Sequence, residues 1–130
     1  MKSKIAVKTE KAPIPVGPYN QAIKAGGFIY CSGQIAINPE TNLIDGLGDI
    51  KAETEQVLKN LEAVLDAGGA SIQDVIKTTI FLTDLDNFQI VNSIYSDFFK
   101  GEITPARACV EVSSLPKGVL VEIDCVAFLG

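Results

Sequence analysis

The segment PARACVEV places one cation, Arg107, at the start of an otherwise apolar stretch that predicts a β-strand. Side chains alternate between the two faces of a strand, so Arg107 is expected to share a face with Cys109 and Glu111. A guanidinium keeps its proton and offers a fork of N–H donors that matches a carboxylate. The pattern indicates a site for an anionic substrate. A structural arginine, paired with an acid or reaching into solvent, remains the alternative.

An acidic residue, Glu122, interrupts the most apolar stretch of the chain, VLVEIDCVAFL. Burial of a carboxyl group raises its pKa, whereas a nearby arginine lowers it. A carboxylate in this position can hold and activate a water molecule, which is the chemistry of a general base. A structural or edge-exposed glutamate is the alternative, and Asp124, on the same strand face, is an equally open candidate for the acid.

Four further residues have groups suited to the wall of a pocket. Cys109 would carry a thiolate if the cation of Arg107 dominates, and would otherwise be a small apolar filler. Tyr19, in the loop VGPYNQ, offers a phenol hydroxyl. Ser32 and Gly33 end a strand, where a hydroxyl and an unhindered backbone can approach a ligand closely.

The composition excludes several kinds of chemistry. None of the 130 residues is a histidine, which removes Ser-His-Asp and Cys-His catalysis and histidine-ligated metals. Three cysteines without a CxxC pattern predict neither a disulfide framework nor a metal site. A net charge of −5 argues against nucleic-acid binding. The absence of an apolar leader and of a run near ~20 apolar residues predicts no signal peptide or membrane span, and hence a cytoplasmic protein.

The strands and loops that carry these residues follow from local patterns. Strands are expected over Lys4–Thr9, Ala22–Ala25, Phe28–Ser32, Asp74–Thr83, Ala106–Val112 and Val119–Leu129. The second and third of these strands read as a hairpin around a Gly-Gly pair. The proline-rich segment Lys11–Gln21 and the glycine-containing segment Gly33–Leu47 predict loops.

Two amphipathic helices are expected between the strands. Asp49 is a suitable N-cap for the first helix, whose apolar residues recur at helical spacing until Gly68 and the glycine after it. The second helix is expected to start near Asp86 or Asn87 and to stop at Gly101. Each helix has one apolar face to bury, and a sheet is the natural partner for both.

The order of elements predicts an α+β fold with a mixed sheet and both helices packed on one face, in one domain over residues 1–130. The strand-helix-strand unit Phe28–Thr83 should cross right-handed and pair its two strands in parallel. The other sheet face is left uncovered, and apolar residues such as Ile29, Ile80, Leu82 and Val110 are expected on it. Oligomerisation through this face is therefore expected.

The stretch PARACVEVSSLPKGVLVEID, residues 105–124, resembles the signature of the RidA/YjgF family: Pro-Ala-Arg, a small residue, alternating aliphatics, Leu-Pro, then a glutamate between aliphatics. Four other pieces agree with the family and occur in order: APIPVGPYNQA, CSGQIAINPETN, QVLKNLEAVLDAGGAS and VIKTTIFLTDLDNFQIVN. The resemblance spans nearly the whole chain, which makes it more specific than any single motif.

This resemblance implies a chorismate-mutase-like α+β sandwich that forms homotrimers with clefts between subunits. It also implies hydrolysis of 2-aminoacrylate and related enamine and imine acids to 2-keto acids and ammonia, with no metal and no organic cofactor. By motif position, Arg107 would bind the substrate carboxylate and Glu122 would position or activate water. Tyr19, Cys109, and the pair Ser32 and Gly33 would line the same pocket, with Tyr19 and Cys109 close to the chemistry.

Two other functions remain open at this point. A trimer with the same Arg107 pocket could bind 2-keto acids or another protein for regulation, without turnover. Some relatives are associated with ribonuclease activity or inhibition of translation. The acidic charge, the absence of histidine and the lack of an aromatic-basic stripe count against that activity.

Overall fold

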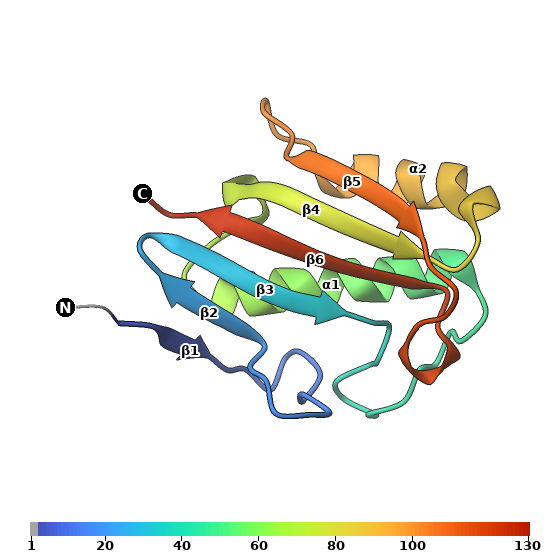
Figure 1. The fold of residues 1–130 in the computed structure, drawn as a ribbon, viewed down its shortest axis with the longest axis horizontal. Coiled ribbons are helices and arrows are strands. Elements are labelled where there is room, and N and C mark those ends of the chain that lie inside the picture. The colour runs from blue at the N-terminus through green and yellow to red at the C-terminus, as the bar shows by residue number, and fades with distance from the viewer. Residues whose placement is uncertain (1–2) are drawn as a thin grey trace.

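The computed structural model describes residues 3–130, which form one six-stranded sheet covered on one face by two α-helices (Figure 1). The strands are β1 (Ile5–Val7), β2 (Ala22–Ala25), β3 (Phe28–Gln34), β4 (Val75–Leu82), β5 (Ala106–Glu111) and β6 (Val121–Phe128). The α-helices are α1 (Ile50–Ala67) and α2 (Phe88–Phe98), and short 3-10 turns cover Ile72–Asp74, Leu85–Asn87 and Pro116–Gly118. The α+β architecture predicted from the sequence is therefore confirmed.

The order of strands across the sheet is β1-β2-β3-β6-β4-β5, and this order corrects one expectation. The strands before and after α1, β3 and β4, were expected to pair in parallel. Instead β6 lies between them and is antiparallel to both. The parallel pair in the sheet is β4 with β5, on either side of α2. The buried residues at every second position of β6 show that one of its faces packs against the helices, but this alternation does not specify its neighbours in the sheet.

The first helix forms as its capping and periodicity predict. The carboxylate of Asp49 accepts hydrogen bonds from the backbone N–H groups of Lys51 and Ala52. Gly68 ends the helix, and Gly69 follows with a φ of 84°, a left-handed conformation that favours glycine. The second helix starts slightly later than expected, because a 3-10 turn at Leu85–Asn87 precedes it.

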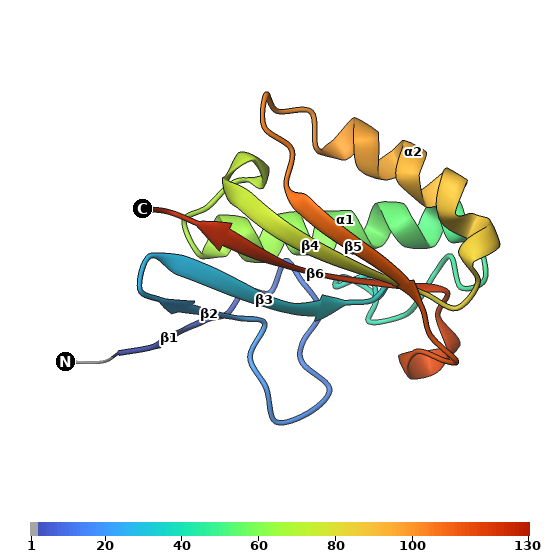
Figure 2. The same cartoon turned by 45° about the horizontal axis from the view of Figure 1, so that its top comes forward.

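The core lies between the sheet and the helices, and its composition corrects a second expectation. Ile29, Ile80 and Leu82 were expected on the uncovered face, but they are fully buried beneath the helices. Because strand residues alternate faces, placing these three inward turns their neighbours Tyr30 and Phe81 outward. Both helices lie behind the sheet in Figure 1, and Figure 2 shows α2 along the β5 edge.

The uncovered face nonetheless carries exposed apolar side chains, as predicted. Val110 is 42% exposed, Tyr30 51% and Phe128 45%, and the half-buried residues Phe81 and Val126 lie in register with them. We call this surface the open face of the sheet. An apolar face of this kind on a folded chain commonly marks a site of association. No helix in the part of the chain that the structure describes is long and apolar enough to cross a bilayer.

Candidate functional site

Arg107 lies on the edge strand β5 with its side chain turned toward α2. Its guanidinium carbon stands 4.9 Å from the ring centroid of Tyr95 and 5.4 Å from that of Phe88. Nη1 donates a 2.7 Å hydrogen bond to Oδ1 of Asn92. Phe88, Asn92 and Tyr95 follow one another at four- and three-residue spacing, which puts them on one face of the helix. Two aromatic rings and an amide therefore fix the orientation of the guanidinium.

The charge of Arg107 has no acidic partner among residues 3–130. The salt bridge recorded there joins Lys100 and Asp97 at 4.0 Å, on the exposed end of α2. The side chain of Arg107 is itself exposed, and one of its five N–H donors is used by Asn92. The remaining donors suffice for a bidentate contact with a carboxylate. Arg107 is therefore not a structural arginine held in an ion pair with an acid of residues 3–130.

Cys109 lies two residues further along β5 on the same face as Arg107, as predicted. It is half-buried and packs against the main core. Burial raises the pKa of its thiol, and the opposing effect of the Arg107 charge is smaller. The thiol is therefore protonated near neutral pH, and the neighbouring cation does not make it a nucleophile.

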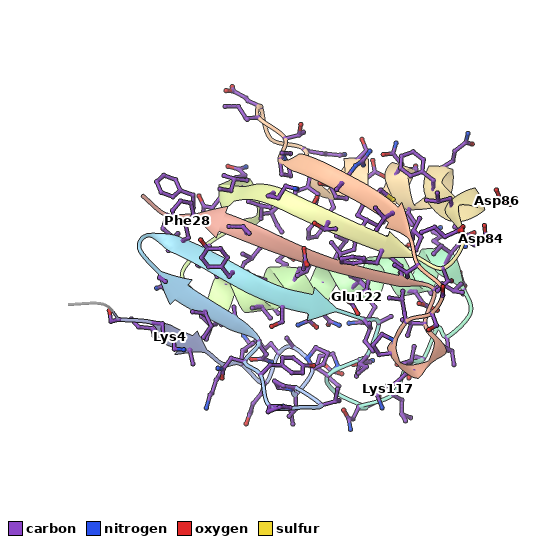
Figure 3. The ribbon with its side chains drawn as sticks, viewed as in Figure 1. Lys4, Phe28, Asp84, Asp86, Lys117 and Glu122 are labelled. Atoms are coloured by element: carbon purple, nitrogen blue, oxygen red, sulfur yellow. The ribbon has the colours of Figure 1, made fainter. Side chains whose placement is uncertain are left out.

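Glu122 lies on the open face of β6, beside the end of β3 (Figure 3). Burial raises the pKa of its carboxyl group, and the nearby Asp124 carboxylate raises it further. Of the two opposing effects considered from the sequence, burial is the one found within the chain, and Arg107 is not among the causes of this pKa shift. The pKa of Asp124 is also raised by burial, although hydrogen bonds from Thr79 and the charge of Lys77 oppose the change.

Gly33 leaves the space that the Glu122 carboxylate occupies. A Cβ atom at residue 33 would stand 2.5 Å from Oε2 of Glu122, so any larger residue would push the carboxylate away. Glu122 and Gly33 also line a small cavity of about 60 Å³ together with Tyr19 and the proline-rich loop. Three of the predicted site residues therefore meet at one end of the sheet.

Ser32 joins this end of the sheet to the loop that carries Tyr19. Its hydroxyl donates a 2.6 Å hydrogen bond to the carbonyl oxygen of Asn20, and its backbone N–H donates to that of Gln21. Tyr19 is 48% exposed, and its hydroxyl accepts a long contact of 3.4 Å from the N–H of Val16. Ser32 thus anchors the loop, while the half-exposed Tyr19 lines the cavity.

Gln21 holds the same loop from beneath, and its role was missing from the sequence-based prediction. Its side chain is buried, with Oε1 accepting from the Thr9 N–H and Nε2 within 3.3 Å of the carbonyl oxygens of Thr9, Ala12 and Pro13. A proline-rich loop has few donors of its own, so a side-chain amide supplies the missing partner. In the sequence, the indication of this role was a single amide side chain, Gln21, at the end of the proline-rich loop.

Substituting Gln21→Met should lower the free energy of unfolding by about 2 kcal/mol, because it leaves buried loop groups without partners. Urea denaturation followed by circular dichroism measures the change. The same substitution at Gln89, which is exposed on α2, is the matched control and should change stability by less than about 0.5 kcal/mol. Equal effects of the two substitutions would contradict the role given to Gln21.

The site residues form two groups that lie far apart within a single copy of the chain. The arginine group comprises the predicted residues Arg107 and Cys109 together with Asn92, which the sequence did not single out. The carboxylate group comprises Glu122, Gly33, Tyr19 and Ser32. Glu122 on β6 is in register with Phe81 on β4, which is in register with Val110 on β5. Arg107 therefore lies two strands away from Glu122 and three residues before Val110 along β5. Strand geometry converts this offset to roughly 14 Å between Cα atoms.

The two groups also face opposite sides of the sheet. Arg107 points toward α2, whereas Glu122 lies on the open face. A small molecule bound to Arg107 cannot reach Glu122 of the same chain. Within residues 3–130, no cluster of three or more histidine, cysteine, aspartate or glutamate side chains could hold a metal ion.

Comparison with known proteins places the chain in one family. Residues 9–129 match the family model described as Endoribonuclease L-PSP. The 2-iminobutanoate/2-iminopropanoate deaminase of Escherichia coli K12 is 42% identical over 123 residues, which cover 93% of this chain and 94% of the enzyme.

Solved structures agree with this placement. A protein of unknown function of the conserved Rid family from Yersinia pestis superposes with a TM-score of 0.94 at 51% identity, covering 97% of this chain and 99% of that one. Escherichia coli TdcF with bound serine gives a TM-score of 0.91 at 37% identity, with coverage of 97% and 99%.

Proposed function

The chain belongs to the RidA/YjgF/RutC family, whose model is described as Endoribonuclease L-PSP, and we propose that it hydrolyses reactive 2-imino and 2-enamino acids to 2-keto acids and ammonia. The observation that carries the proposal is Arg107, an exposed guanidinium held in a fixed orientation with no acid paired to it. The similarity to an enzyme named for 2-iminobutanoate and 2-iminopropanoate suggests these as substrates. TdcF with bound serine supports a ligand of amino-acid size.

The reaction follows from the chemistry of the two groups. Arg107 binds the substrate carboxylate and so fixes the adjacent C=N carbon. Glu122 takes a proton from a water molecule as the water oxygen bonds to that carbon, and the resulting carboxylic acid gives this proton to the imine nitrogen, which restores the carboxylate. The C–N bond then breaks as the hydroxyl proton moves to the nitrogen, so ammonia leaves and the hydroxyl oxygen becomes the keto oxygen. Within the single chain, burial and the Asp124 carboxylate raise the pKa of Glu122. Arg107 of the next copy acts in the opposite direction, because a cation favours the carboxylate form that a general base needs.

The proposed site needs two copies of the chain, since one copy keeps Arg107 and Glu122 on opposite faces. We infer that the β5 edge of one copy meets the carboxylate group of the next. Contacts between two different surfaces of identical chains form closed rings when the rotation closes. The apolar open face would be buried inside such a ring, and a homotrimer satisfies these conditions.

The two alternative functions predict different measurements. A regulatory trimer would bind 2-keto acids through Arg107 but would leave the rate of imine hydrolysis unchanged. A ribonuclease would need cationic groups along a phosphate backbone, whereas this chain has a net charge of −5, one arginine and no histidine. These features favour the deaminase.

The test couples an amino-acid oxidase to the purified protein and follows imine disappearance together with release of the 2-keto acid. Acceleration above the spontaneous rate is expected for small aliphatic imino acids. Binding of 2-ketobutanoate without acceleration would replace the proposal with the regulatory alternative. Absence of both would overturn it.

Glu122 also sets the expected pH dependence. Hydrolysis requires its carboxylate form, so kcat/KM should fall as pH decreases through the pKa of Glu122, which burial and the Asp124 carboxylate both raise. The variant Asp124→Asn removes one of the two causes, so its pH midpoint should move to lower pH. The pH profile of kcat/KM measures this shift. Asp97→Asn, an exposed acid on α2, is the control and should leave the midpoint in place.

A further inference from the structure

The hydrogen-bond partner of Arg107 is a neutral amide, that of Asn92, and the neutrality of this partner affects how Arg107 can bind a ligand. Oδ1 of Asn92 accepts the 2.7 Å hydrogen bond from Nη1. An arginine side chain has donors only, so the amide oxygen must face it and the amide nitrogen must point away. Among the hydrogen bonds of residues 3–130, none uses Nδ2 of Asn92. The amide therefore fixes Arg107 and retains a free donor of its own.

The aromatic part of this cradle is rigid. The hydroxyl of Tyr95 is 2.7 Å from Oγ1 of Thr78, inside the core. The ring of Tyr95 packs against that of Phe99, with centroids 4.5 Å apart. Tyr95 is therefore anchored at both its hydroxyl and its ring, and it forms a fixed floor under the guanidinium. Side-chain rotation of Arg107 is restricted before any ligand arrives.

Every group in this cradle is uncharged. Phe88, Asn92 and Tyr95 touch the guanidinium without neutralising it, and no acid among residues 3–130 lies within ion-pair distance of Arg107. An aspartate at position 92 would have almost the same shape and would bind the guanidinium more strongly. It would also compete with an incoming carboxylate for the same charge.

We propose that Asn92 is a positioning residue whose neutrality keeps the charge of Arg107 available to the substrate carboxylate. The inference rests on the proposed function, because it assigns a part of the same site. It predicts that the isosteric substitution Asn92→Asp, which strengthens the contact with Arg107, weakens substrate binding. A purely structural role for Asn92 predicts the reverse, since an ion pair would hold Arg107 at least as well.

The experiment compares the wild type with Asn92→Asp and Asn92→Ala, each checked for folding by circular dichroism. In Asn92→Asp, KM for imine hydrolysis should rise about tenfold, with kcat within about twofold of the wild-type value. Asn92→Ala loosens Arg107 but adds no competing charge, so KM should rise only about threefold. Ser93→Asp adds the same charge at an exposed neighbouring position and should leave KM unchanged.

A second readout does not depend on catalysis. Arg107 is the only arginine of the chain, so modification by phenylglyoxal, followed by mass spectrometry, reports on this one guanidinium. Modification should be slower in Asn92→Asp than in the wild type and unchanged in Ser93→Asp. A wild type without deaminase activity would end the proposed function, while the modification rates would still test the effect of Asn92. Wild-type KM or a wild-type modification rate in Asn92→Asp would overturn the inference.

Discussion

Arg107→Ala is expected to lower kcat/KM for the hydrolysis of 2-imino acids by about a thousandfold, to a rate near that of the spontaneous reaction. The substitution removes two charge-assisted hydrogen bonds to the carboxylate and the orientation that they impose on the C=N carbon. The fold should stay intact, because the side chain of Arg107 is exposed and its loss removes the partner of one half-buried amide, that of Asn92.

The coupled assay measures this loss, and thermal unfolding confirms that the variant is folded. Lys100→Ala removes an exposed cation just beyond the end of α2, the helix that packs against Arg107, and should retain full activity. Arg107→Lys keeps the charge but not the planar fork, so it should recover only part of the lost rate. Full activity in Arg107→Ala would contradict the assignment of the carboxylate-binding residue.

Glu122→Gln is expected to lower kcat by about a hundredfold while changing KM by less than about threefold. The amide has the size of the carboxylate and should fit against Gly33, but it cannot take a proton from water. Because burial already disfavours the charged form of Glu122, the variant should be at least as stable as the wild type near neutral pH.

Steady-state kinetics and thermal unfolding together test this prediction. Glu102→Gln, on the exposed loop before β5, is the matched control and should change neither kcat nor stability. A kcat unaffected in Glu122→Gln would transfer the role of general base to another group, with Asp124 as the first candidate. A large loss of stability would instead assign Glu122 a structural role.

Local sequence signals predicted the elements well, because the forces that form them are local. Asp49 and Gly68 bound α1 as their capping properties require. The pairing of strands depends on contacts distant in sequence, and the position of β6 between β3 and β4 has no local signature. The phase of strand alternation was wrong for Ile29 and Ile80, since either face of an apolar strand can turn toward a helix.

The candidate site was predicted in part. Arg107 and Glu122 stand out because each is a charge within an apolar strand. That they face opposite sides of the sheet depends on the strand order. Asn92 left a weak signal, a polar residue at helical spacing between the aromatics Phe88 and Tyr95. Its meaning depends on Arg107, which lies fifteen positions away and comes close only through the parallel pairing of β4 and β5.

The measurement that tests the central claim most directly mixes the two inactive variants. Arg107→Ala and Glu122→Gln chains are combined in equal amounts, dissociated in urea, refolded together and assayed for imine hydrolysis. If each site takes its arginine from one copy and its glutamate from the next, about one quarter of the sites contain both, since each residue is intact in half of the chains. The account therefore predicts recovery of about a quarter of wild-type activity. Activity no higher than that of the separate variants, from chains that have exchanged, would contradict a deaminase site shared between copies.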